Sequence, residues 1–185
     1  NGITINALCA LSGLELHKNC ITQAKASADF IRNHLRTTDG GFSPSLILDE
    51  YAYVLDGLVS LLQKSWREVD IAFARKIADA LIDDFYDTKV GGFYMAPRNT
   101  EHLIFNPKPT MDETSGPGNA IASSALNKLG LILGESTFRD AALNTLRWAR
   151  TIIEYNPASH CGFMTSLFET ARIKYAVIFR GPDEE

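Results

Sequence analysis

Residues suited to acid–base chemistry are concentrated at three places in this chain, each just before a segment that is poor in charge. They are Asp49, Glu50 and Tyr51; then Asp112, Glu113, Ser115 and Asn119; and last His160. Carboxylates and an imidazole that meet in one site could exchange protons with a substrate, or could hold the hydroxyl groups of a sugar. Aromatic side chains such as Tyr51, Tyr53 and Tyr94 could offer flat apolar surfaces to a sugar ring.

These residue types give two sets of candidates. The candidate catalytic residues are Asp49, Asp112 and His160. The candidate ligand-binding residues are Glu50, Tyr51, Tyr94, Glu113 and Asn119. Asp112 and Glu113 could share a divalent ion with Asp49, but their spacing matches no known metal-binding loop. We therefore predict neither a metal nor a cofactor.

Each candidate also has a structural explanation. Asp49 and Glu50 stand where a helix is expected to begin, and carboxylates there complement the free N–H groups and the dipole of the helix. Asn119 immediately precedes an expected helix and is interpreted first as its N-cap. His160 follows a helix and could bond a neighbouring carbonyl group. The case for function therefore depends on whether the three places share one rim of the molecule.

Composition and motifs argue against several classes of function. The net charge of −4 argues against a nucleic-acid partner, which needs a basic face. No apolar stretch is long enough for a membrane helix. The sequence contains no G-x-G-x-x-G, P-loop, H-E-x-x-H or G-x-S-x-G motif. Cys9, Cys20 and Cys161 form no C-x-x-C pair, and this cysteine usage fits a reducing compartment, so we expect a cytoplasmic protein.

Two kinds of helical segment alternate along the chain and must position these residues. Three segments carry a single charged residue each and are expected to be buried helices: 2–16 with Glu15, 51–63 with Asp56, and 120–133 with Lys128. Three charge-rich segments with one-sided apolar stripes are expected to be surface helices: 21–36, 70–86 and 138–154. With a seventh helix over 163–173, this order predicts an all-α fold of αα-hairpins stacked in an inner and an outer layer.

A glycine–phenylalanine turn recurs after the surface helices. Gly40-Gly41-Phe42 and Gly91-Gly92-Phe93 follow the first two, and a weaker copy, Cys161-Gly162-Phe163, follows the third. Glycine permits the left-handed backbone that ends a helix tightly, and the Phe is expected to plug the end of the hairpin. One repeat is therefore predicted to be helix, turn, helix.

The remaining segments are less regular. The long connection between Gly92 and Asn119 is rich in proline yet contains many apolar residues, and we expect a small β-hairpin over 93–106 within it. A short strand is expected at 175–179. Residues 1–180 are expected to form one domain, followed by a flexible tail at 181–185.

Six stretches of the chain have the order and spacing of motifs found in one protein family. They are Asn1-Gly2, the L-D-E-Y-A-Y of residues 48–53, the D-G-L of 56–58, the G-G-F-Y of 91–94, the segment 112–119, and the segment 155–160. In these the chain resembles the thioredoxin-domain-containing proteins of the DUF255 class, the family of spermatogenesis-associated protein 20. Residues 175–179 also resemble the closing strand of that family. The chain departs from the family pattern at Glu50, which replaces an Asp, and at Pro117, which stands one place late.

The resemblance implies that the chain is the C-terminal part of an (α/α)6 toroid, similar to N-acylglucosamine 2-epimerases and six-hairpin glycosidases. Members carry an N-terminal thioredoxin-like domain, so that domain and the rest of the toroid are expected partners. A sugar-handling relative implies a carbohydrate ligand at the loop rim, bound there or converted by epimerase-like or glycosidase-like chemistry. The alternative is a non-catalytic module that binds proteins, or self-associates through apolar faces that an incomplete ring would expose.

Overall fold

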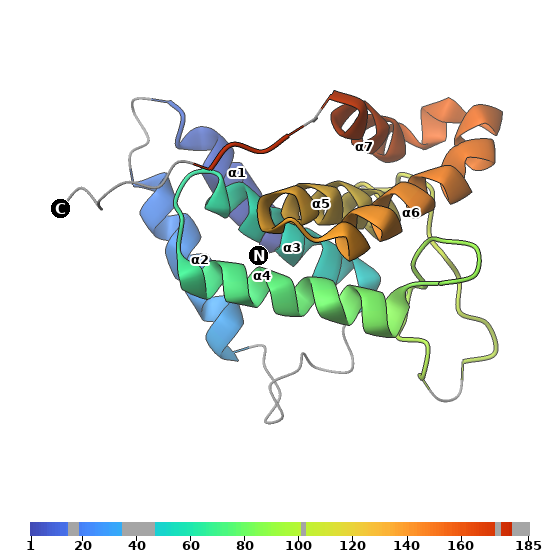
Figure 1. Cartoon of the computed structure of the whole chain (residues 1–185), viewed down its shortest axis with the longest axis horizontal. Helices are drawn as coiled ribbons and strands as arrows, with labels where there is room; N and C mark the ends of the chain where they lie inside the picture. Colours follow the sequence, from blue (N-terminus) through green and yellow to red (C-terminus); the bar gives the residue numbers. More distant parts are fainter. Residues whose placement is uncertain (15–18, 35–46, 101–102, 173–174, 179–185) are drawn as a thin grey trace.

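The computed structural model describes residues 1–14, 19–34, 47–100, 103–172 and 175–178, and their regular structure is helical (Figure 1). The helices are α1 (Gly2–Leu11), α2 (Cys20–His34), α3 (Leu48–Leu62), α4 (Glu68–Ala80), α5 (Gly118–Leu133), α6 (Ser136–Tyr155) and α7 (Cys161–Arg172). A π-helical turn, η2 (Leu81–Phe85), extends α4, and a 3-10 turn, η3 (Pro157–Ser159), leads into α7. The predicted all-α class is confirmed.

The helices pack in the order that the alternation predicts. Along one layer α1 contacts α3, α3 contacts α5, and α5 contacts α7; each of α2, α4 and α6 packs on the helix that precedes it (Figure 1). This arrangement is compatible with a stack of αα-hairpins with an inner and an outer layer. Among the described residues, no helix combines the length and the apolar character that crossing a membrane requires.

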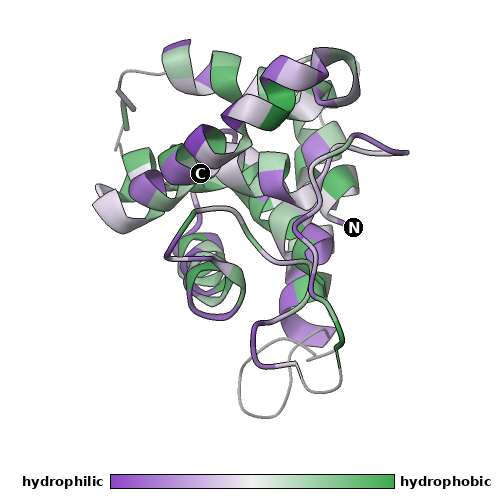
Figure 2. Cartoon of the chain, turned by 90° about the vertical axis from the view of Figure 1, so that its right-hand side faces the viewer, coloured by the Kyte–Doolittle hydropathy of each residue, from purple (hydrophilic) through white to green (hydrophobic). Residues whose placement is uncertain are grey.

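The outer helices bury the stripes that their periodicity predicts. The buried residues include Ala24, Ala28 and Ile31 of α2, Phe73 and Ile77 of α4, and Ala142, Leu146, Ala149 and Ile153 of α6. Figure 2 shows hydrophilic and hydrophobic residues on the same helices, as one-sided burial requires. The one-sided burial predicted for these three helices is therefore confirmed at these residues.

The inner helices are buried to different degrees. Helices α3 and α5 are buried along most of their length, as expected of charge-poor segments. Helix α1 is not: Ile3 is 56% exposed and Leu11 is 42% exposed. The expectation that this segment is buried on all sides is wrong for α1, which packs on α3 and α2 and leaves part of its surface exposed.

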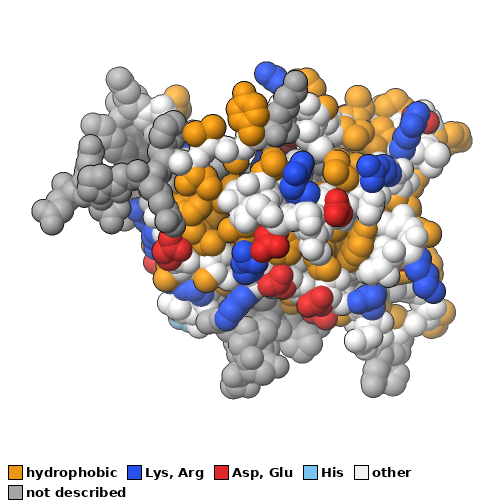
Figure 3. All heavy atoms as spheres, in the orientation of Figure 1, with side chains coloured by type: hydrophobic (Ala, Val, Ile, Leu, Met, Phe, Trp, Pro, Cys, Tyr) orange, Lys and Arg blue, Asp and Glu red, His pale blue; other side chains and the backbone are white. Residues whose placement is uncertain are grey.

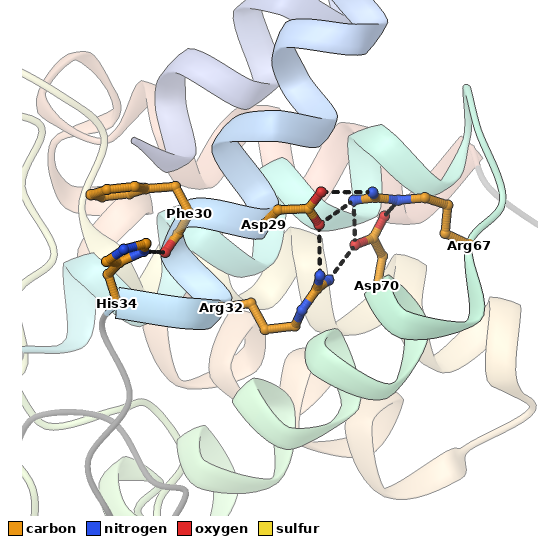
Figure 4. A network of polar contacts seen from close by, with 6 residues as sticks. All are labelled: Asp29, Phe30, Arg32, His34, Arg67 and Asp70. Atoms are coloured by element: carbon orange, nitrogen blue, oxygen red, sulfur yellow. Dashed lines mark hydrogen bonds and ion pairs between the residues drawn. The ribbon is translucent and has the colours of Figure 1, made fainter.

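A charged cluster joins α2 to the start of α4 in the outer layer (Figure 4). Arg67 holds Asp70 with two hydrogen bonds, from Nε at 2.6 Å and from Nη2 at 2.8 Å. Asp29 of α2 accepts from Arg67 at 3.1 Å and from Arg32 at 2.7 Å. The side chain of Asp70 is fully buried, so these contacts replace its hydration.

The glycine–phenylalanine turn is confirmed at one of its three copies. Gly91 and Gly92 have φ values of 85° and 79°, in the left-handed region that favours glycine. Phe93 follows them and is fully buried, as expected of a side chain that closes the end of the hairpin. The copy at 40–42 lies outside the described residues. The third copy is wrong as a turn, since Cys161, Gly162 and Phe163 form the first turn of α7.

The β-hairpin expected over 93–106 is not formed as strands in the described part of the chain. The side-chain amide of Asn106, rather than its backbone, exchanges two hydrogen bonds with Ala96, at 3.0 and 2.8 Å. The carbonyl of Pro107 accepts from Met95 N–H at 2.7 Å. Pro107 has no N–H of its own, so a regular ladder cannot continue there. Residues 101 and 102 lie outside the described residues.

The strand expected at 175–179 is likewise absent from its described residues, 175–178. A strand needs a neighbour to share its hydrogen bonds, and the described residues offer only an isolated bridge between Tyr86 and Phe93. Residue 179 and the expected tail at 181–185 lie outside the described residues.

Candidate functional site

The starts of α3, α5 and α7 meet at one end of the molecule, and two candidate carboxylates join them. Asp49, in the first turn of α3, accepts a hydrogen bond from the N–H of Gly118, the first residue of α5, at 2.9 Å. Asp112 accepts with both carboxylate oxygens from the N–H of Gly162 in the first turn of α7, each at 3.1 Å. The structure therefore brings the three sequence regions to a common rim.

Asp49 lies in α3 and caps α5, whereas Asp112 lies in the connection before α5 and caps α7. The first N–H groups of a helix have no partner within it, so an external carboxylate satisfies one of them and also complements the helix dipole. The approach at α5 depends on glycine: a Cβ on Gly118 would lie 2.2 Å from Asp49 Oδ1. Asp49 and Asp112 thus have a structural role that explains their positions.

The pKa of Asp49 lies above its ordinary value. Burial is the main cause; the N–H of Gly118 partly offsets it, while the nearby charges of Glu113 and Glu50 raise the pKa further. A carboxyl with a raised pKa beside a cavity is a candidate proton donor.

His160 is engaged by its own chain. Its Nδ1 lies 2.6 Å from the carbonyl oxygen of Asn156, so this nitrogen carries a proton and donates it. The residue is only 4% exposed, and its Nε2 has no partner among the described residues. The structural explanation given for His160, a bond to a neighbouring carbonyl, is confirmed.

Two of the candidate ligand-binding residues hold the polypeptide itself. Glu50 accepts the N–H of Ile47 at 2.8 Å, which confirms its predicted capping role at α3. Asn119 is not the N-cap of α5 as expected, since α5 begins at Gly118 after Pro117. Its buried side chain instead accepts from Phe93 N–H at 2.7 Å and donates to the carbonyls of Phe93 and Pro109, both at 2.9 Å.

Tyr94 and Glu113 have different roles. Tyr94 donates its hydroxyl hydrogen to Asp87 at 2.8 Å, and its ring lies 4.8 Å from the ammonium of Lys108, which also pairs with Asp87 at 2.6 Å. Glu113 is exposed on the rim. Tyr94 therefore anchors the long connection before α5, and Glu113 contributes charge near Asp49.

A cavity of about 370 Å³ lies at the rim between the starts of α1 and α3, and we name it the rim pocket. Its lining includes Asn1, Asp49, Glu50, Tyr51, Tyr53 and Ser115. The ring of Tyr51 packs on Phe85 with centroids 5.0 Å apart, and burial raises the pKa of its hydroxyl to about 12. Tyr53 donates to the carbonyl of Gly116 at 2.7 Å, which fixes its ring at the pocket wall.

A second cavity of about 480 Å³ lies between the four inner helices, and we name it the inner-face cavity. Its polar lining includes Asn6 of α1, Asp56 of α3, Ser124 and Lys128 of α5, and Ser166 and Glu169 of α7. None of these was predicted as a site residue. A signal was present: Asp56 and Lys128 are the single charged residues of their charge-poor segments. A lone charge on an otherwise buried helix must face a partner or a cavity.

Among the described charged side chains of the inner-face cavity, Lys128 and Glu169 form an ion pair, whereas Asp56 bonds a neutral amide. Lys128 Nζ lies 2.8 Å from Glu169 Oε2, and the hydroxyl of Ser124 donates to the same oxygen at 2.6 Å. Burial opposes ionisation of Glu169, but these contacts outweigh it and lower its pKa. Asp56 accepts a hydrogen bond from Asn6. Burial raises the pKa of Asp56, although Lys128 and Asn6 lower it and Glu169 raises it.

The described residues contain no cluster of three or more His, Cys, Asp or Glu side chains arranged to hold a metal ion. Comparison of the sequence with protein-family models and with curated proteins finds no match.

Proposed function

We propose that this chain is part of an α/α toroid and binds a carbohydrate in the rim pocket. The observation that carries the proposal is the lining of that pocket, which combines two acidic residues, Asp49 and Glu50, with two tyrosines, Tyr51 and Tyr53. Sugars present hydroxyl groups at their edges and apolar C–H groups on their faces. Carboxylates accept from the former, and aromatic rings pack on the latter.

The size of the pocket and the motif resemblance support this proposal. A volume of about 370 Å³ falls within the usual range for small-molecule sites. Six stretches of the chain resemble motifs of a family whose toroid is similar to those of sugar epimerases and glycosidases. The rest of the ring and the thioredoxin-like domain that the resemblance implies as partners belong to the same proposal. Asp49, with its raised pKa, is the residue we would assign to proton transfer if the sugar is converted.

The test is a calorimetric titration with a panel of mono- and disaccharides. We expect at least one sugar to bind, and Tyr53→Ala to weaken its binding about fivefold or more, because loss of an aromatic platform costs on the order of 1 kcal/mol or more. Tyr53→Phe keeps the ring and should retain most of the affinity. Tyr155→Ala removes a tyrosine that is 92% exposed at the end of α6 and serves as the matched control.

Absence of binding by every sugar, or equal affinity in Tyr53→Ala and Tyr155→Ala, would count against the carbohydrate proposal.

The second candidate function is self-association or binding of another protein. It is favoured by the exposed apolar residues of α7, where Met164 is 46% exposed and Phe168 is 60% exposed. Figure 3 shows apolar side chains along the upper edge of the molecule, where Figure 1 places α7. Concentration-dependent sedimentation without sugar binding would support this second candidate.

A further inference from the structure

The inner-face cavity is separate from the rim pocket and has no part in the function proposed above. Four inner helices contribute polar groups to it, among them Asn6, Asp56, Lys128 and Glu169. A volume of about 480 Å³ is far larger than one or two waters need and lies within the range of small-molecule sites. Asp56 and Lys128, the single charged residues of their charge-poor segments, both line this cavity.

The cavity has a surplus of negative charge. Lys128 is the one cation among its described lining residues, and Glu169 already pairs with it at 2.8 Å. Asp56 receives a hydrogen bond from the neutral amide of Asn6, and no ion pair to Asp56 is formed by the described residues. Asp112 adds another carboxylate to the lining. A group that complements this lining must therefore be positive.

The raised pKa of Asp56 agrees with the conclusion that the complementary group is positive. Burial raises its pKa because the carboxylate has lost part of its hydration without gaining a counter-ion in contact. A partly buried charge of this kind is a cost to the folded protein unless a ligand compensates it. The ligand group best suited to compensate it is a protonated amine, which donates charge-assisted hydrogen bonds.

Ser166 supplies an independent observation. It lines the same cavity from α7, is only 2% exposed, and its hydroxyl has no hydrogen-bond partner among the described residues. Buried hydroxyl groups in folded proteins nearly always have a partner. A hydroxyl can both donate and accept, so its natural complement is a ligand hydroxyl or amide. Ser60 of α3 adds a further hydroxyl to the lining.

We propose that the inner-face cavity binds a small molecule that carries a protonated amine beside several hydroxyl groups. The amine pairs with Asp56 between Asn6 and the Lys128–Glu169 pair, and the hydroxyl groups bond Ser166 and its neighbours on α7. This assignment rests on the cavity alone and holds or fails independently of the rim pocket.

The test compares three probes that share one carbon skeleton and differ in one terminal group. They are 1-amino-1-deoxysorbitol with an ammonium, sorbitol with a hydroxyl, and gluconate with a carboxylate. Each is titrated at pH 7 into the isotopically labelled chain and followed by amide chemical shifts. We expect the amine to bind about tenfold more tightly than sorbitol, the gain of one charge-assisted hydrogen bond. Gluconate should bind most weakly, and the shifts should fall on α3, α5 and α7.

Two variants and one control locate the effect. Asp56→Asn is nearly isosteric and should abolish the advantage of the amine over sorbitol, while its melting temperature should equal or exceed that of the wild type because a desolvated charge is removed. Ser166→Ala should weaken both polyols and leave their ratio unchanged. Asp140→Asn removes the same charge from an exposed position on α6 and should bind like the wild type.

Equal affinity for the amine and sorbitol, tighter binding of gluconate, or an amine advantage that persists in Asp56→Asn would overturn the assignment. Amide shifts confined to residues around Tyr53 would do the same, because they would place the amine in the rim pocket. The rim proposal is tested by other sugars and by Tyr53 variants, so either proposal can fail while the other stands.

Discussion

At the scale of single residues, the main finding is that candidate catalytic carboxylates act as helix caps across the inner layer. Asp112 holds the N–H of Gly162 with both oxygens at the start of α7, and Asp49 holds that of Gly118 at the start of α5. A cap does not preclude chemistry, since one carboxylate can satisfy an N–H and still face a cavity. It does explain why acidic residues stand at these positions without invoking a substrate.

The capping role of Asp112 predicts a stability effect. Asp112→Ala removes both acceptors for Gly162 N–H and should cost about 1 kcal/mol, as for other helix caps. In a domain of this size that corresponds to about 2–4 °C in melting temperature. Thermal unfolding followed by circular dichroism measures it. Asp140→Ala, at an exposed position of α6, should leave the melting temperature unchanged; an equal effect of both substitutions would refute the cap.

At the scale of elements, a charged cluster links two helices of the outer layer. The cluster of Asp29, Arg32, Arg67 and Asp70 ties α2 to the start of α4 (Figure 4). These two helices belong to successive hairpins, so the cluster joins neighbouring units of the stack.

Loss of the buried member of this cluster should be costly. Asp70→Asn removes the charge that Arg67 holds with two hydrogen bonds inside the protein, and we expect a loss of about 3 kcal/mol in the free energy of unfolding. Urea denaturation measures it. Glu154→Gln, which breaks the exposed pair with Arg150 on α6, is the matched control and should have no measurable effect. A small loss in Asp70→Asn would show that Asp29 compensates.

At the scale of the whole molecule, two paired aspartates predict how stability depends on pH. Burial opposes ionisation of Asp87, but Lys108, the N–H of Lys89 and the hydroxyl of Tyr94 hold its pKa well below the ordinary value of 3.8. Arg67 and Arg32 similarly outweigh burial and lower the pKa of Asp29. A carboxyl with a lowered pKa in the folded state stabilises it fully above the ordinary value and loses this effect as pH falls through the lowered one.

The stabilisation that Asp87 and Asp29 contribute should therefore be lost as the pH is lowered below 3.8. Asp87→Asn should be less stable than the wild type at pH 7, and the difference should shrink on acidification because protonation already removes the wild-type interaction. Melting temperatures from pH 7 to pH 2 measure both. Parallel curves for the two proteins would contradict the assignment to Asp87, and Asp140→Asn should follow the wild type throughout.

The helices could be predicted from the sequence because the residues that a helix buries on one face recur at helical spacing. Phe73 and Ile77, or Ala142 and Ala149, recur at helical spacing, and all of them are buried. The exposure of α1 could not be predicted in this way, since an apolar helix at the edge of a layer has the same composition as one inside it. The irregular segment after Phe93 was missed as well, because the side chain of Asn106 replaces backbone pairing there.

The candidate site was predicted only in outline. The shared rim follows from the regular alternation of helices, and in the structure Asp49 and Asp112 bond the starts of α5 and α7. Which cavity each residue faces depends on packing across segments far apart in sequence. Asp56 and Glu169 are separated by more than a hundred residues and line one cavity, and no local pattern records that meeting.

The caps that Asp49 supplies to α5 and Asp112 supplies to α7 have a consequence for how the protein unfolds. The start of α5 depends on a carboxylate from the preceding hairpin, and the start of α7 on one from the connection before α5. A hairpin isolated from its predecessor would therefore lose a polar partner as well as an apolar neighbour. Stacked units coupled in this way gain stability with each addition and melt together. These caps therefore favour cooperative unfolding of the inner helices. Amide hydrogen exchange should report one opening event shared by α3, α5 and α7.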